Sequence, residues 1–230
     1  MATEVEQATK RRVPLNRERV LRAAVELADR EGIDALSMRR LGQELGVEAM
    51  SLYNHVSGKE DLLDGMVDLI LEEIEPAAEG DDWKTAVRNR ILSARRAMVR
   101  HPWASAVIVS RKQASAAMMK YMDSMAGLFL GHGFSVDLMH HGFHVLGSRI
   151  LGFSQELYDD SVELEQSPEI QAIMMKQMAA EYPNLSLIVD QITHDEASVV
   201  GAGCDDQVEF EFSLDLILDG LERLKDRPPA

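Results

Sequence analysis

Apolar residues recur every three to four positions along most of the chain, and this spacing places them on one side of an α-helix. The first such stretch predicts a helix from Asn16 to Glu31, because Asn16 is a favourable N-cap residue and Gly32 follows the last turn. Its buried stripe is expected to comprise Val20, Ala24, Leu27 and Ala28.

Two short helices are predicted between Ser37 and Val56, separated by a glycine turn. Ser37 is a favourable N-cap, and Gly46 can take the left-handed conformation that ends a helix. The second of these helices is expected from about Glu48 to His55. The pair predicts a helix-turn-helix, whose second helix fits the DNA major groove; an ordinary helical hairpin with a basic edge is the alternative. Leu41, Leu45, Leu52 and Val56 are the expected inward positions.

The outward side of the second short helix carries small or flat side chains that suit a nucleic-acid surface. Cations flank this side before and after it, as phosphate anchoring requires. The outward residues are Ala49, Met50, Ser51, Tyr53 and Asn54, and the flanking cations are Arg39, Arg40 and Lys59.

The remaining chain reads as a series of helices, and no stretch of consequence alternates as a strand does. A connecting helix begins at Lys59 and ends before Pro76. Further helices are expected at about 83–100, 103–110, 113–130, 135–157, 167–182 and 206–224, with a partly helical segment at 185–197 and an acidic loop at 158–166. The predicted fold is therefore all-α, with an N-terminal three-helix helix-turn-helix domain joined by the connecting helix to a larger helical domain. We place a tail at 1–13, the DNA-binding domain at 14–60, a ligand-binding and dimerisation domain at 61–225 and a second tail at 226–230.

The composition agrees with a helical fold and indicates in which cellular compartment the protein is found. Hydrophobic residues make up 46% of the chain and aromatic residues only 5%, which favours helix over sheet. The single cysteine, Cys204, excludes an internal disulfide, and no apolar run approaches the length of a membrane span. We therefore expect a soluble cytoplasmic protein.

The formal net charge of −15 is distributed unevenly along the chain. Residues 1–60 hold ten Lys and Arg against ten Asp and Glu, whereas residues 61–230 hold 14 against 29. Because salt screens charges beyond ~10 Å, local cations decide whether the N-terminal part can approach DNA. The asymmetry supports two functionally separate halves.

Three sequence elements follow one another through the predicted helix-turn-helix and into the connecting helix. They are the core Leu41, Gly42, Gln43, Leu45, Gly46 and Val47, the signature Leu52, Tyr53, His55 and Val56, and the helix start Lys59, Leu62 and Leu63. Together with the helix before them, they resemble the DNA-binding domain of TetR-family transcriptional regulators over residues 1–75. The closing segment FEFSLDLILDGLERL is similar, more loosely, to the end of the TetR-type ligand domain.

The resemblance, together with position, implies roles in binding double-stranded DNA. The residues expected to contact base edges are Arg39, Ala49, Met50 and Asn54. The residues expected to contact phosphates are Ser37, Ser51, Tyr53, His55 and Lys59. Two such helices on a two-fold axis would read a near-palindromic operator.

The helices at 135–157 and 206–224 have more apolar surface than one domain easily covers, so we expect them to pair with a second copy in a four-helix bundle. TetR-like proteins imply the same arrangement, with a self-contained monomer as the alternative. The expected interface residues are Val145, Ile150, Phe210, Leu214, Ile217 and Leu221.

Eight of the 13 methionines fall between Met118 and Met178, and methionine suits adaptable apolar sites as well as plain cores. We expect a small apolar or aromatic effector that releases the DNA, as the family implies. The candidate pocket residues are Met66, Trp83, Trp103, Met118, Met122, His141, Phe143 and His144.

Other chemistry has weaker support in the sequence. His140 and His144 are spaced to share a metal, but no third ligand is fixed, so we assign no metal site and expect no cofactor. No base accompanies Cys204, no phosphate-binding glycine loop exists, and no catalytic residues are assigned. The alternatives to a ligand-responsive repressor are a helical-bundle enzyme or small-molecule carrier, in which the N-terminal pair does not read DNA, and a nonspecific architectural DNA binder.

Overall fold

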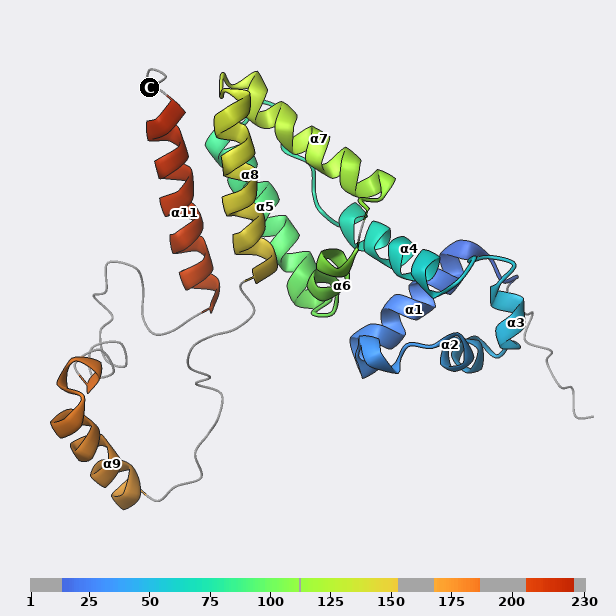
Figure 1. Cartoon of the computed structure of the whole chain (residues 1–230), viewed down its shortest axis with the longest axis horizontal. Coiled ribbons are helices and arrows are strands. Elements are labelled where there is room, and N and C mark those ends of the chain that lie inside the picture. Colours follow the sequence, from blue (N-terminus) through green and yellow to red (C-terminus); the bar gives the residue numbers. More distant parts are fainter. Residues whose placement is uncertain (1–13, 112, 153–167, 187–205, 226–230) are drawn as a thin grey trace, which may run out of the picture. The chain divides into compact units, whose positions relative to one another are not determined.

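The computed structural model describes residues 14–111, 113–152, 168–186 and 206–225, and these residues form helices and their connections with no β-strand (Figure 1). The predicted all-α class is confirmed. The chain divides into two compact units. The first comprises the chain up to Glu75 together with Arg96–Tyr121, and the second comprises Pro76–Arg95 together with the chain from Met122 onward.

The first unit is built on the predicted N-terminal helices. They are α1 (Arg17–Glu31), the 3₁₀ turn η1 (Ile33–Ala35), α2 (Met38–Leu45), α3 (Ala49–Leu52) and α4 (Lys59–Glu72), joined by α6 (Ala104–Ser110). The Asn16 side chain accepts a hydrogen bond from the Arg19 backbone N–H at 2.8 Å, which confirms the predicted N-cap. The fully buried core includes Val20, Leu27, Leu41, Leu52, Leu62, Met66 and Ile70.

In the second unit α11 (Asp206–Lys225) packs beside α8 (Val136–Gly152) and is bonded to α5 (Trp83–Arg100), whose residues up to Arg95 belong to this unit (Figure 1). This unit also contains most of α7 (Ala116–Gly131), which supplies the buried Phe129, and it contains α9 (Pro168–Glu181). Asp82 caps α5 by accepting hydrogen bonds from the Lys84 and Thr85 backbone N–H groups. Edge-on aromatic contacts fill one end of its core, where the Trp83 and Phe134 ring centroids lie 4.6 Å apart.

Ion pairs fasten α11 to α5 along their length. Arg88 binds Asp215 at 2.7 Å and Glu211 at 2.8 Å, and Lys84 binds Asp219. The contacts made by Arg88 raise its pKa, chiefly through the hydrogen bond to Asp215. These cations offset part of the acidic charge that the second unit carries.

Three helices have ends that differ from the prediction. α3 ends at Leu52 rather than near His55, because the Tyr53 and Asn54 N–H groups bond to carbonyls three residues back and close the helix as a tighter turn. α4 ends at Glu72, where the next two N–H groups do the same. α7 starts at Ala116 rather than 113, because the Ser115 hydroxyl caps it.

Parts of several predictions lie outside the described residues. They are the expected tails, the last turn of the 135–157 helix, the acidic loop at 158–166 and most of the 185–197 segment. No helix among the described residues combines the length and the apolar character needed to cross a bilayer.

Candidate nucleic-acid interface

The turn between α2 and α3 holds the two helices at a fixed angle. Gly46 has φ 66°, a left-handed conformation, and its N–H bonds to the Gln43 carbonyl at 3.2 Å. The Val47 N–H bonds to the Gly42 carbonyl at 2.9 Å, which completes a Schellman motif. The predicted glycine turn is confirmed.

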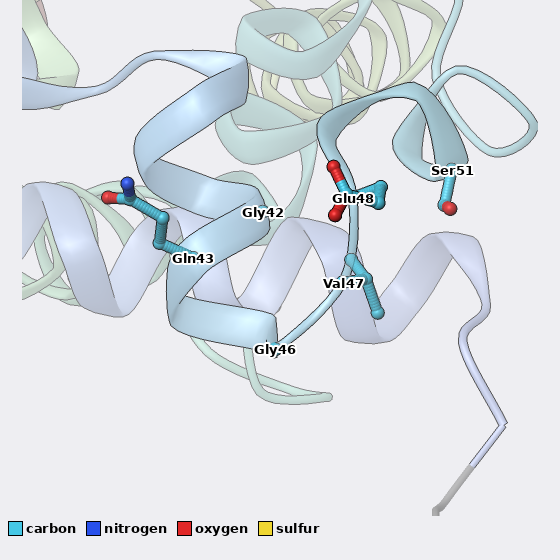
Figure 2. Close-up of a pocket in the computed structure, with 6 residues that line it drawn as sticks. All are labelled: Gly42, Gln43, Gly46, Val47, Glu48 and Ser51. Atoms are coloured by element: carbon cyan, nitrogen blue, oxygen red, sulfur yellow. The ribbon is translucent and has the colours of Figure 1, made fainter.

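Gly42 allows α2 and α3 to approach closely. A Cβ atom at this position would lie 3.0 Å from the Val47 carbonyl oxygen and 3.2 Å from the Ala49 Cα. These neighbours are backbone atoms that cannot move aside without shifting α3. Figure 2 shows the open hollow at this turn, lined by Gly42, Gln43, Gly46, Val47, Glu48 and Ser51.

The inner side of α3 is anchored in the core of the first unit. Leu41, Leu52 and Val56 are at most 1% exposed, as the sequence predicted, whereas Leu45 is half-buried. A four-residue helix has little stability of its own, so its position depends on these contacts.

A polar clamp fixes the chain immediately after α3. Arg17 of α1 donates to the His55 carbonyl at 2.9 Å and binds both carboxylate oxygens of Asp61 in α4. Asp61 also accepts from the Ser57 backbone N–H at 2.7 Å. These hydrogen bonds, that from Arg17 first, lower the pKa of Asp61 to about 2. The sequence analysis did not identify Arg17 or Asp61, which are 44 residues apart.

The inner side of α3 is buried, whereas its outer side and the turn that follows it are largely exposed. Met50 is 74% exposed and Tyr53 is 47% exposed, although both are large side chains that folding usually covers. Asn54 is also exposed, and Ala49 and Ser51 are partly exposed. The structure therefore brings the predicted outward residues together on one face, although Tyr53 and Asn54 lie in the turn after α3.

The two arginines at the start of α2 have different surroundings. Arg40 binds Glu31 at 2.6 Å and Glu44 at 3.1 Å, and these contacts raise its pKa. Arg39 is exposed and makes no hydrogen bond or ion pair with any described residue. Arg39 is therefore available to a ligand, whereas Arg40 is committed to holding α2 against α1.

The predicted phosphate contacts outside α3 differ in their exposure and in their partners. Lys59 is exposed at the first position of α4. The Ser37 hydroxyl accepts from the Arg40 N–H at 3.2 Å, which leaves its own proton for an acceptor outside the protein. His55 is half-buried, and Arg17 holds its carbonyl.

The eight candidate pocket residues are divided between the two units. Met66, Trp103 and Met118 belong to the first unit, where Met66 is fully buried, Met118 is half-buried and the Trp103 indole donates to Asp29 at 2.6 Å. In the second unit Trp83 is 5% exposed and the Phe143 ring lies 5.8 Å from that of Phe129. Met122, His141 and His144 are exposed. The pocket remains a prediction.

The candidate interface residues on α8 and α11 differ in burial: some are buried within the single chain and others are partly or largely exposed. Phe210, Leu214 and Leu221 are buried within the single chain, where Phe210 also stacks under Arg95 at 4.3 Å. Ile150 and Ile217 are half-buried, and Val145 is 47% exposed. Besides the predicted Val145, α8 and α11 leave four further large apolar side chains exposed: Val136, Phe212, Leu216 and Leu224.

His140 and His144, which are spaced to share a metal, are not joined by a third ligand in the described part of the chain. Among the described residues, no three His, Cys, Asp or Glu side chains gather as a metal site would require. Cys204, the other candidate considered for reactive chemistry, lies outside the described residues.

Two short helices joined by a left-handed glycine, the second of them buried on its inner side and exposed on its outer side, define a helix-turn-helix DNA-binding protein. Family models agree with this class and make it specific. Residues 20–66 match "Bacterial regulatory proteins, tetR family", and residues 75–224 match "Tetracyclin repressor-like, C-terminal domain". The chain belongs to the TetR family of transcriptional regulators, which are not enzymes.

Individual relatives extend the match over most of the chain. It is 33% identical to the HTH-type transcriptional repressor DrrR1 of Streptomyces coeruleorubidus, over 91% of this chain and 78% of that protein. It is 43% identical to the tetracycline repressor protein class D of Escherichia coli over 90 residues, which are 38% of this chain and 41% of that one. The TetR family protein ActR of Streptomyces coelicolor, solved in complex with actinorhodin, aligns with a TM-score of 0.68 at 29% identity over 94% of this chain and all of that one.

Proposed function

We propose that this chain is a ligand-responsive repressor that binds a near-palindromic operator as a homodimer and is released by a small apolar or aromatic effector. The DNA-binding domain is residues 14–60 and the ligand-binding and dimerisation domain is residues 61–225, with tails on either side. We place it in the cytoplasm, in keeping with its single cysteine and its proposed binding to DNA.

The observation that carries the proposal is the contrast between the two sides of α3. The inner side is fully buried, whereas Met50 and Tyr53 on the outer side remain exposed beside the unoccupied Arg39. Exposure of large side chains over a short, firmly anchored helix marks a binding surface. The charge balance of residues 1–60 does not oppose DNA, because each side chain acts over only ~10 Å in salt.

Each residue on this face has a role that follows from its chemistry. Arg39 would read guanine O6 and N7, and Met50 or Ala49 would contact a thymine methyl group, while Asn54 suits adenine. Ser37, Ser51, Tyr53, His55 and Lys59 would bind phosphates and fix the register of the helix on the duplex. Arg40 has no direct role in this scheme.

Dimerisation follows from the surface that α8 and α11 leave uncovered. Val136 is 66% exposed and Leu216 is 53% exposed, within an apolar set that includes Val145, Phe212 and Leu224. A second copy would cover this set with an identical set, and a two-fold axis would bring two α3 helices to successive major grooves. The operator should therefore have inverted half-sites.

The effector is inferred from two sources. ActR is crystallised with actinorhodin and with (S)-DNPA, so a chain with this fold binds small molecules. The methionine-rich sequence between Met118 and Met178 suits an adaptable apolar site. An effector can release DNA only if it binds the released conformation more tightly than the DNA-bound one.

The proposal is tested by selecting bound duplexes from a random DNA pool with the purified full-length chain. We expect an enriched inverted repeat, and binding of that repeat should weaken steeply with salt. A chain that prefers no inverted repeat over scrambled competitor would instead be a helical-bundle small-molecule binding protein whose N-terminal helices do not read DNA. Recovery of DNA without sequence preference would indicate an architectural binder.

A further inference from the structure

Met50, on the outer side of α3, is the most exposed large apolar side chain in the described part of the chain, at 74%. Ala49 and Ser51 beside it have small side chains, and Leu52 is buried on the inner side of the helix. The Met50 thioether is therefore within reach of small reagents in solution. A thioether is also chemically reactive, because oxidants convert it to a polar sulfoxide.

The methionines that form the core are shielded from the same chemistry. Met66, Met98 and Met125 are 0%, 8% and 4% exposed. Met119 of α7 is 60% exposed, but α7 carries none of the residues assigned to DNA. A mild oxidant can therefore reach Met50 while the packing of both units stays intact. Oxidation changes the DNA-facing surface without unfolding the chain.

The helix that carries Met50 cannot move aside to accommodate a changed side chain. Leu41, Leu52 and Val56 anchor it from beneath and are at most 1% exposed. Gly42 lets α2 and α3 approach so closely that one added Cβ atom would lie 3.0 Å from a backbone oxygen of the turn. A change in the Met50 side chain therefore alters the surface that meets DNA rather than the position of α3.

We propose that Met50 is an oxidation site through which peroxide releases the chain from its operator. The inference rests on the proposed function, in which Met50 contacts a thymine methyl group. The sulfur atom gives an electron pair to one oxygen of hydrogen peroxide, the O–O bond breaks, an S–O bond forms and the other oxygen leaves as water. Sulfur is oxidised by two electrons and the peroxide is reduced by two, so the reaction needs no further reactant.

The sulfoxide opposes binding because it is polar. Its oxygen accepts hydrogen bonds from water, and burying it against a methyl group removes that water without supplying a donor. A homodimer carries two copies of Met50, one for each half-site. A loss of about tenfold per half-site therefore becomes about 100-fold for the whole operator, since independent contacts add in free energy.

This release differs from release by the apolar effector, because it acts on the DNA-binding surface and not on the candidate pocket. DNA covers Met50 in the complex, so the oxidant acts on the free chain and prevents its return to the operator. Methionine sulfoxide reductases convert the sulfoxide back to the thioether, which makes the change reversible.

The test is to treat the purified full-length chain with hydrogen peroxide and to measure its affinity for the selected inverted repeat by gel shift. We expect affinity to fall about 100-fold as peptide mass spectrometry records sulfoxide at Met50, and to recover after incubation with methionine sulfoxide reductases. Bound operator should slow the oxidation of Met50 but not that of Met119. Met66 should stay unoxidised with and without DNA.

Met50→Leu and Met119→Leu are the matched variants. Peroxide should leave the affinity of Met50→Leu at its own untreated value, because leucine has no sulfur, although this variant keeps Cys204 and every other methionine. Met119→Leu should lose affinity as the wild type does. Unchanged wild-type affinity after oxidation of Met50, or an equal loss in Met50→Leu, would overturn the inference alone. An untreated chain that prefers no inverted repeat would overturn the proposed function and this inference with it.

Discussion

The guanidinium of Arg17 contacts both carboxylate oxygens of Asp61, at 2.6 and 3.1 Å, and so joins α1 to α4 directly after α3. The same guanidinium holds the His55 carbonyl. One pair of residues thus fixes three segments: the helix that underlies α3, the turn that follows it and the start of α4. The position of α3 depends on this pair as well as on its apolar anchors.

The Asp61→Asn variant should lower the free energy of unfolding at pH 7 by about 1 kcal/mol. The lowered pKa of Asp61, about 2, reflects stabilisation of its charged form, and the figure is discounted because Arg17 is 46% exposed. A group with a depressed pKa contributes stability above its unfolded value, here 3.8, and loses it as pH falls toward 2. Urea titrations should therefore show a constant difference between the proteins above pH 4 that shrinks in acid.

Glu18→Gln is the control for that prediction. Glu18 pairs with Arg22 at 2.9 Å on an exposed part of α1, where ion pairs contribute little. The urea unfolding curve of the Glu18→Gln variant should match that of the wild type at all pH values. A pH-independent difference for Asp61→Asn would show that lost packing, rather than charge, accounts for its effect.

Arg39→Ala and Arg40→Ala should differ in how they affect DNA. Loss of Arg39 should weaken binding of the selected operator by about 10- to 100-fold and relax the preference for its sequence, as expected for a bidentate base contact. Arg40 is bound by Glu31 and Glu44, so its loss should leave sequence preference intact. Gel shifts with operator and scrambled duplexes measure both quantities. If Arg40→Ala relaxed the sequence preference and Arg39→Ala did not, Arg40 rather than Arg39 would be the residue that contacts the bases.

Gly42→Ala should impair DNA binding at least tenfold. Its Cβ would lie 3.0 Å from the Val47 carbonyl oxygen, so the turn and α3 must shift, at a cost of about 1–3 kcal/mol in stability. Gly127→Ala is the control, because this glycine lies within α7 with nothing within 4 Å of the added Cβ. Alanine there should stabilise the chain by about 0.5–1 kcal/mol and leave operator affinity unchanged. Thermal unfolding and gel shifts on both variants distinguish the two effects.

Leu216→Asp should produce a folded monomer. Leu216 is 53% exposed on α11, so a charge there is tolerated by one chain but not between two apolar surfaces. Leu214→Asp, two residues earlier and fully buried, should instead destabilise the chain by about 3 kcal/mol or more. Light scattering gives the mass and circular dichroism gives the folded fraction. A Leu216→Asp dimer of normal stability would move the interface to another face.

The sequence by itself determined the features whose causes are local. Asn16, Ser37 and Gly46 set helix ends through hydrogen bonds to residues only a few positions away, so their roles are visible in the chain. The buried positions of Leu41, Leu52 and Val56 follow from helical periodicity in the same way. The family resemblance, carried by the same stretch, was confirmed by both family models.

Only the tertiary structure decided which of several similar side chains is paired with a carboxylate and which is buried. Arg39 and Arg40 are neighbours of the same type, and the carboxylates of Glu31 and Glu44 around Arg40 distinguish them. On α11 apolar residues lie on more than one side, so periodicity could not tell the buried Leu214 from the exposed Leu216. Such choices depend on how distant helices cross, and crossing is set by packing across the whole unit, which no local pattern encodes.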